Sequence, residues 1–399
     1  MAGIAALSTL CEESAIRTLA GMRSYPFFTA LRLLILAGLM ALSGCDGGVR
    51  VPADLPDATA VARQGQAFLE AMKPRRPGKP VIAVLAYNES TETTDFLLSH
   101  AVLQRSGVAQ VEAVAPRKGP VALYPALQIE VAQDLGSFDR AHPGGADYVI
   151  VPALDDADDP AISRWLQQQT AKGARIVSVC AGALIVGRAG LLDGRRFVTH
   201  WHFRKDVLRR HPTATYVPHQ RYTVDGNIAT TTGITASMPA MLALVEAVGG
   251  RARAQELAAE LGVASWTPAH DSSAFGVDAR RAVHYLLAKA AFWRDEHWEL
   301  DARDGLDDIA VALTADAWSR TGHVRVTASG ARPVTLKSGL RLLTERAEAS
   351  QGRLPLTPGL NPSQQLDQTL CEIANRFGQA RSEWVMMELE YPGRLQCSR

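Results

Sequence analysis

The stretch RIVSVCAGALIVGRAG (175–190) places one cysteine, Cys180, between a β-branched run and a run of small residues. The first run predicts a buried strand and the second a helix, so Cys180 falls at the junction of the two. Free N–H groups at a helix start favour a thiolate, and the N–H of Ala181 is placed to hold an oxyanion. The sequence leaves two interpretations open: a nucleophile, or a packed thiol that acts as a small hydrophobe.

Strands and helices alternate along residues 80–265 around this cysteine. We expect buried strands of the kind found in parallel sheets and a short antiparallel excursion near 120–130. The alternation predicts an α/β domain with a doubly wound, mainly parallel sheet, and places Cys180 at its carboxyl edge, where such sheets bind ligands. The expected parallel strands of this part of the sheet span residues 81–87, 108–115, 147–153 and 175–180.

Residues 270–399 are expected to form an appended α+β region. Its segment 307–343 echoes 94–130 in the order helix, Arg-small-Gly, strand, Pro-Val turn and second short strand. Duplication and chance reuse of a common unit both fit this echo. No cysteine-bearing strand-turn-helix recurs in the region, so we expect no second site there. In the tail, the pattern predicts a helix over 366–378 and a strand over 382–392.

The N-terminal residues 1–45 have the pattern of an export signal. Arginines flank an apolar run, LLILAGLMAL, which is too short to span a bilayer and is followed by LSGC ending at Cys45. This ending resembles the lipobox of bacterial lipoproteins, and the resemblance implies lipidation of Cys45 and translation from Met22. A plain signal peptide and an uncleaved anchor are the alternatives.

The following segment, 46–79, is rich in Pro, Ala and Gly and is expected to be a tether containing one short helix. Together with the lipobox, it predicts an exported lipoprotein anchored on the periplasmic side of the cell envelope. Export would permit a disulfide between Cys371 and Cys397, although the sequence leaves this pairing open.

Composition is that of a globular chain and argues against nucleic acid as a partner. Of 399 residues, 47% are hydrophobic and 21% charged, and the net charge is +1, without a dense Lys/Arg stripe. We therefore expect a small-molecule partner, and contact with the membrane through the lipid.

Four segments resemble the ThiJ/PfpI superfamily of class I glutamine-amidotransferase-like domains, in particular its isonitrile-hydratase and regulator-sensor branch. They are VIAVLAYNESTETTDFLL (81–98), DYVIVPA (147–153), SVCAGALIVGRAGLLDGRRFVTHW (178–201) and TTTGITASMPAMLALVEAVGG (230–250). The resemblance implies a cysteine site that needs no cofactor and no metal, and a possible homodimer.

The resemblance also implies the partners of the cysteine. The family's elbow cysteine falls on Cys180, and its neighbouring acid falls on Asp95, with Glu92 as the alternative. Asp95 also fits an acid that only complements a helix start. The histidine about twenty residues after the cysteine falls on His200, as a general base or as a polar wall of the site.

The chain departs from the family pattern at two places. Ala181 stands where protease-type members have histidine and isonitrile hydratases have a hydroxyl, which argues against peptidase activity and puts isonitrile hydration in doubt. The family's Gly-Gly oxyanion turn is replaced by ALDDADDP, so the N–H groups of Ala153 and Leu154 are the remaining donors. Its acids are expected to be a solvated helix start rather than a metal site; they are Asp155, Asp156, Asp158 and Asp159.

Two functions remain after these observations. The first is a cysteine-dependent hydratase or hydrolase of a small carbonyl, nitrile-like or amide compound, in which Cys180 attacks, Asp95 tunes the thiol and His200 moves a proton. The second is a non-catalytic ligand or redox sensor that uses the same cysteine pocket.

Overall fold

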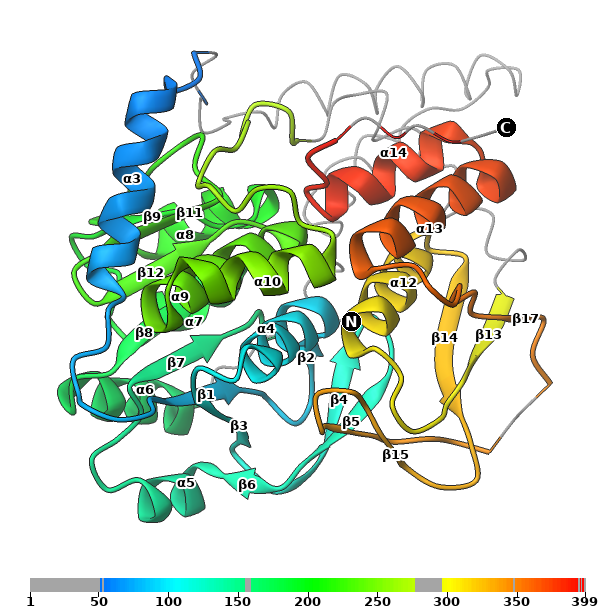
Figure 1. The fold of residues 1–399 in the computed structure, drawn as a ribbon, viewed down its shortest axis with the longest axis horizontal. Helices are drawn as coiled ribbons and strands as arrows, with labels where there is room; N and C mark the ends of the chain where they lie inside the picture. The colour runs from blue at the N-terminus through cyan, green and yellow to red at the C-terminus, as the bar shows by residue number, and fades with distance from the viewer. Residues whose placement is uncertain are drawn as a thin grey trace, which may run out of the picture. The chain divides into compact units, whose positions relative to one another are not determined.

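The computed structural model describes residues 51, 54–154, 159–276, 296–346, 349–393, 395 and 397. Seven strands form the central sheet in the order β11-β12-β8-β7-β1-β3-β6 (Figure 1). All neighbouring pairs are parallel except β11–β12. This confirms the predicted doubly wound, mainly parallel sheet. Its strands are β1 (Val81–Leu85), β3 (Gln110–Ala115), β6 (Gln133–Asp134), β7 (Tyr148–Val151), β8 (Arg175–Ser178), β11 (Tyr222–Asp225) and β12 (Ile228–Thr231).

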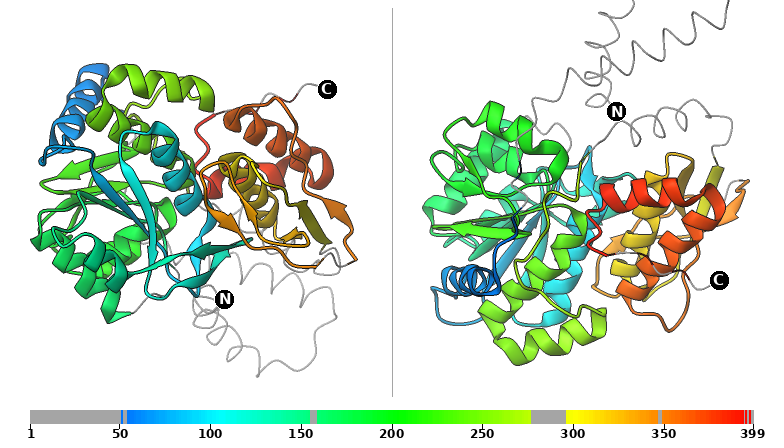
Figure 2. Two further views of the ribbon diagram at one scale, coloured as in Figure 1. Left: turned by 60° about the horizontal axis from the view of Figure 1, so that its bottom comes forward. Right: turned by 90° about the horizontal axis from the view of Figure 1, so that it is seen from above.

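Helices cover both faces of this sheet (Figure 2). Alternate residues of β1 enter two separate cores: Ile82 and Val84 pack on one face, and Ala83 and Leu85 on the other. This explains why the strands are apolar without interruption. The first face carries α3 (Ala58–Ala71), α4 (Thr93–Ser106), α9 (Ser237–Gly249) and α10 (Arg251–Leu261), and the second carries α5 (Leu135–Ala141), α6 (Pro160–Ala171), α7 (Gly182–Arg188) and α8 (Arg204–Arg210).

The C-terminal region repeats the start of the domain. Its strand β13 (Glu296–Asp301) pairs in parallel with β14 (Val324–Ser329), as β1 pairs with β3, and α12 (Asp308–Arg320) connects them, as α4 connects β1 to β3. A hairpin follows in each case: β4 (Gly119–Tyr124) with β5 (Gln128–Val131), and β15 (Val334–Thr335) with β16 (Arg341–Leu342). This shared order of elements favours duplication over chance reuse.

The two repeats also contact each other. Strand β16 pairs with β5 in an antiparallel arrangement, which gives the strand order β15-β16-β5-β4-β2, where β2 is Thr91–Glu92. Helix α4 packs against α12 (Figure 1). The appended region is completed by β17 (Gly352–Arg353), α13 (Pro362–Phe377) and α14 (Gln379–Glu388).

Part of the predicted tether is packed against the domain. Within 46–79, helix α3 begins after its cap Asp57 and buries Phe68 against Tyr222, with 4.6 Å between the ring centroids. The backbone carbonyl of Met72 accepts a hydrogen bond from Tyr148 Oη (2.6 Å). Helix α3 is therefore packed into the folded domain through Phe68 and is not part of a free tether.

The tail differs from the prediction in one element. Residues 382–392 were expected to be a strand, but α14 continues to Glu388, because Ser382 and Val385, and Trp384 and Met387, lie three residues apart on one buried face. The predicted helix over 366–378 is confirmed by α13. A disulfide joins Cys371 to Cys397.

Within the described part of the chain, every helix is too short or too polar to cross a membrane. The signal segment 1–45, with Met22 and Cys45, lies outside the described residues.

Candidate functional site

Cys180 lies on a sharp turn between β8 and α7. Its φ of 56° is in the left-handed region, which is uncommon for a residue with a side chain. The turn also requires Gly182, because a Cβ there would lie 2.1 Å from the carbonyl oxygen of Val151. The hydroxyl of Thr199 donates to the Cys180 carbonyl (2.7 Å). The chain thus holds the cysteine in a strained elbow at the carboxyl edge of the sheet.

The thiol of Cys180 is enclosed, with 4% of the residue exposed. Burial raises its pKa well above the ordinary value, and the charges of Asp95, Glu92 and Glu390 act in the same direction. A hydrogen bond from the Ala181 N–H opposes them but is the smaller effect. The expected thiolate is therefore not favoured here, because loss of solvent outweighs the start of a helix as short as α7.

Asp95 lies in the first turn of α4 and is fully buried. Burial, and next the charge of Glu92, raise the pKa of its carboxyl well above the usual range. Its Oδ2 accepts the N–H of Ala153 (3.1 Å), while Oδ1 has no partner among the described residues. Ala153, expected as an oxyanion donor, is thus engaged by Asp95, and Leu154 forms a bridge with Thr91.

Glu92, the alternative acid, caps α4 and faces the C-terminal region. Its Oε2 accepts the N–H of Asp95 (2.6 Å), and its Oε1 lies 2.7 Å from Nη2 of Arg320. Arg320 also binds Asp316 (2.8 Å) and Glu388 (3.4 Å). Glu92 is therefore a member of a buried ion network.

Both ring nitrogens of His200 form hydrogen bonds to backbone groups, so the side chain is not available as a general base. Its Nε2 bonds to the carbonyl of Glu388 (3.0 Å), and its Nδ1 accepts the N–H of His202 (3.4 Å). Burial lowers its pKa well below the usual value, so the ring is neutral, with the proton on Nε2. Both nitrogens are used by backbone groups, which places His200 in the wall of the site.

Glu390 reaches the same site from the segment after α14, and the sequence did not indicate it. The residue is 2% exposed and has a φ of 48°. Its Oε1 accepts the N–H of Trp201 (2.8 Å) and its Oε2 the N–H of Gly233 (2.7 Å). His270 lies 3.7 Å away through Nε2. No sequence signal marks Glu390, whereas Arg320 could have been found from the echo, which aligns it with Arg105.

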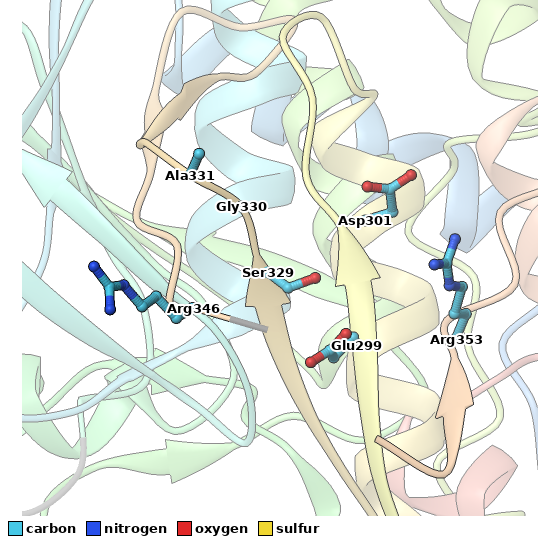
Figure 3. Close-up of a pocket in the computed structure, with 7 residues that line it drawn as sticks. All are labelled: Glu299, Asp301, Ser329, Gly330, Ala331, Arg346 and Arg353. Atoms are coloured by element: carbon cyan, nitrogen blue, oxygen red, sulfur yellow. The ribbon is translucent and has the colours of Figure 1, made fainter. Parts of the chain in front are cut away.

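A cavity of about 530 Å³ lies in the C-terminal region, apart from the residues predicted for the site. It opens at the carboxyl ends of β13, β14 and β17, and Figure 3 shows Glu299 and Asp301 between Arg346 on one side and Arg353 on the other. Ser329, Gly330 and Ala331 complete its lining.

The described residues contain no cluster of His, Cys, Asp and Glu able to hold a metal ion. Asp159 caps α6 by accepting the N–H of Ala161 (2.8 Å), as expected of a helix start. Asp155, Asp156 and Asp158 lie outside the described residues.

Comparisons with known proteins match the domain rather than the whole chain. The model of the DJ-1/PfpI family matches residues 81–247. Isonitrile hydratase of Pseudomonas putida is 35% identical over 127 residues, which are 32% of this chain and 52% of that protein. The HTH-type transcriptional regulator GlxA of Rhizobium meliloti is 29% identical over 167 residues, 41% and 49% of the two chains. The chain spans about half the length of these curated relatives.

A solved structure of a ThiJ/PfpI family protein from Pseudomonas syringae aligns with 60% of this chain and 95% of its own, at 23% identity and a TM-score of 0.45.

Proposed function

Because residues 81–247 are a DJ-1/PfpI family domain, we propose that this chain is a ligand-binding module that holds a small molecule at the Cys180 site without turning it over. The observation that carries the proposal is the state of the three expected catalytic groups. Cys180 is an enclosed neutral thiol, burial raises the pKa of Asp95 well above its usual range, and His200 is neutral and bonded to the backbone.

Binding of a ligand is favoured over sensing of oxidants. Cysteines that record oxidation are solvent-accessible and have a low pKa, because the thiolate is the species that reacts. Cys180 has the opposite properties: it is buried and its pKa is raised. We therefore expect slow oxidation of Cys180 in the resting protein.

A cysteine-dependent hydratase or hydrolase is the second candidate. It is favoured by the left-handed elbow at Cys180, and by the Ala181 N–H beside the sulfur, which could hold an oxyanion. In this function the thiolate adds to an electrophilic carbon of the substrate and water releases the product. Ala181, which supplies neither histidine nor a hydroxyl, argues against peptide cleavage and weakens the case for isonitrile hydration.

Turnover by the full chain distinguishes the two functions. Wild-type protein and Cys180→Ser are incubated with an aliphatic isonitrile, a 2-oxoaldehyde and a primary amide, and product is measured. We expect no product above the level of Cys180→Ser. Product that disappears in this variant would establish the enzyme and exclude the non-catalytic module.

We also propose that the protein is exported and anchored on the periplasmic side of the cell envelope through lipid on Cys45. The disulfide Cys371–Cys397 supports this location, since such bonds persist in oxidising compartments. The mature protein should then begin at a lipidated Cys45, as mass spectrometry would show, and Cys45→Ala should leave the membrane fraction. Retention of residues 1–44 in the mature protein would contradict the proposal.

Nucleic acid is excluded in this proposal because of the expected export and the small net charge. The names of several relatives, HTH-type transcriptional regulators, point the other way for those proteins. Gel-shift assays with genomic fragments at low salt should detect no retained complex; a complex that survives at physiological salt would overturn this exclusion.

A further inference from the structure

We propose that the Cys180 site takes a small monocarboxylate, and that the side chain of Glu390 occupies its carboxylate subsite as a built-in stand-in. The inference rests on the proposed ligand-binding function and names its ligand class. It starts from the N–H groups of Trp201 and Gly233, which come from two separate segments and converge on one carboxyl group.

Each of the two N–H groups serves a different oxygen of Glu390. Trp201 begins the 3₁₀ helix η1 (Trp201–Phe203), and Gly233 precedes the 3₁₀ helix η2 (Ile234–Ala236). The distances of 2.8 Å and 2.7 Å are those of well-formed hydrogen bonds, and the two bonds oppose the rise that burial causes in the pKa of Glu390. Two donors spaced to match the two oxygens of a carboxylate make a recognition site of defined shape.

The walls of this subsite fit closely around the carboxyl group. A Cβ on Gly233 would lie 2.3 Å from Cδ2 of His200 and 3.0 Å from Cδ of Glu390, so only glycine allows the approach. Burial lowers the pKa of His270 to about 3, so this neighbour at 3.7 Å is neutral. The carboxyl group is therefore held by neutral donors, the two backbone N–H groups and the nearby Thr232 hydroxyl, which lower its pKa.

Unused hydrogen-bonding capacity remains in the same site. Asp95 Oδ1 is buried and has no hydrogen-bond partner among the described residues. Native proteins rarely leave such a group unsatisfied, so it calls for an explanation. A ligand longer than the Glu390 side chain could supply a partner that the stand-in does not reach.

Glu390 belongs to the segment that follows α14. The segment leaves α14 and is held by Thr235, whose N–H donates to the carbonyl of Leu389 (3.0 Å) and whose hydroxyl donates to that of Glu390 (2.7 Å). The left-handed backbone of Glu390 is costly for a residue with a side chain. The segment contributes no strand to the central sheet, so its withdrawal leaves that sheet complete.

Removal of the stand-in tests the proposal by chemical rescue. Glu390→Ala deletes a group of the size and charge of acetate. In this variant we expect iodoacetamide to label Cys180 about tenfold faster than in the wild type, because local opening exposes it. Acetate at about 100 mM should restore slow labelling and raise Tm by about 2–4 °C. Acetamide, its neutral counterpart, should do neither.

A second variant, in which a different length of side chain is removed, keeps the proposal testable if Glu390→Ala does not fold. Glu390→Gly removes one further methylene and adopts the positive φ without strain. The preferred probe should therefore change from acetate to propionate, read from the same labelling rate and Tm. An unchanged preference in the folded variant would overturn the subsite.

Glu390→Gln is the matched control, since it keeps the shape of the side chain and an oxygen acceptor. It should label slowly and gain nothing from acetate. A response to acetate equal to that of Glu390→Ala, or no response to either acid in both shortened variants, would refute the proposal. If the proposed non-catalytic function is wrong, the wild-type chain will turn over a substrate in the separate activity assay. The labelling and Tm measurements do not depend on that result.

Discussion

Arg320 and Glu92 form an ion pair with 2.7 Å between Nη2 and Oε1, across 228 residues of chain. Arg105 and Asp307 form the corresponding pair in the opposite sense, also at 2.7 Å. Each arginine ends one of the paired helices α4 and α12, and each acid caps the start of the other. Reciprocal pairs of this kind are typical of interfaces with two-fold symmetry. Here the two helices that form the interface belong to the same chain.

Through this interface the C-terminal region contributes residues to the Cys180 site of the α/β domain. The region carries no elbow cysteine of its own among the described residues. It supplies Arg320, which binds the cap of the helix that bears Asp95, and Glu390, whose charge raises the pKa of the Cys180 thiol. The C-terminal region is therefore a structural partner of the cysteine site.

Replacement of Arg320 by glutamine should strongly destabilise the protein. The change leaves the buried carboxylate of Glu92 without its cation, and a broken buried pair costs about 3–5 kcal/mol. Urea unfolding at pH 7 measures the loss. Arg332→Gln is the control, since its partner Asp304 is exposed, and its midpoint should be unchanged. Equal midpoints for both variants would contradict a supporting role of the network.

The sequence predicted the elements that local patterns encode. The apolar strands and the strand-to-helix turn at Cys180 depend on short runs of residues. The proximity of Asp95 was expected only from the resemblance to the ThiJ/PfpI superfamily. The charge state of the thiol was not predictable in the same way, because it depends on how completely other segments exclude water. The same reason applies to His200, whose hydrogen bonds go to a turn formed far along the chain.

Residues distant in sequence account for what was missed. Glu390 reaches Gly233 across 157 residues, and periodicity or spacing carries no information on such a contact. The apolar tail around Trp384 fits a strand or a helix when read alone, and its packing decides for the helix.

Gly182→Ala should damage the elbow. A Cβ placed 2.1 Å from the Val151 carbonyl oxygen forces β7 and α7 apart, and overpacking of this kind costs about 3 kcal/mol. Thermal unfolding measures the loss. Gly276→Ala is the matched control, because a Cβ there meets no atom within 4 Å. If the two variants melt together, close packing of the elbow is not required for the fold.

The stability of the protein should decrease as pH rises toward 8 because of Asp316. Burial raises its pKa to about 8, against the opposing charge of Arg320, while Glu92 and Glu388 add to the rise. The folded-state pKa exceeds the unfolded one, so this stabilisation is full below about pH 4 and is lost as pH rises through 8. The slope is at most about 1.4 kcal/mol per pH unit.

Asp316→Asn isolates this contribution. Asparagine keeps an oxygen for Nε of Arg320 but does not titrate. Urea unfolding of both proteins at several values between pH 5 and 9 should show a steeper decline for the wild type. Parallel curves would mean that Asp316 stays ionised throughout, as a tightly held partner of Arg320.

The disulfide Cys371–Cys397 encloses the segment that carries Glu390, so its removal should act on Cys180. The double variant Cys371→Ser/Cys397→Ser frees a loop with a sequence separation of 26, at a cost of about 3.5 kcal/mol by loop entropy. A less constrained segment leaves the site more often, so labelling of Cys180 by iodoacetamide should accelerate. Adding Glu390→Ala to the double variant should accelerate it little further, because both changes open the same site. Unchanged labelling in a destabilised double variant would instead mean that Thr235 and the two N–H donors hold Glu390 without the disulfide.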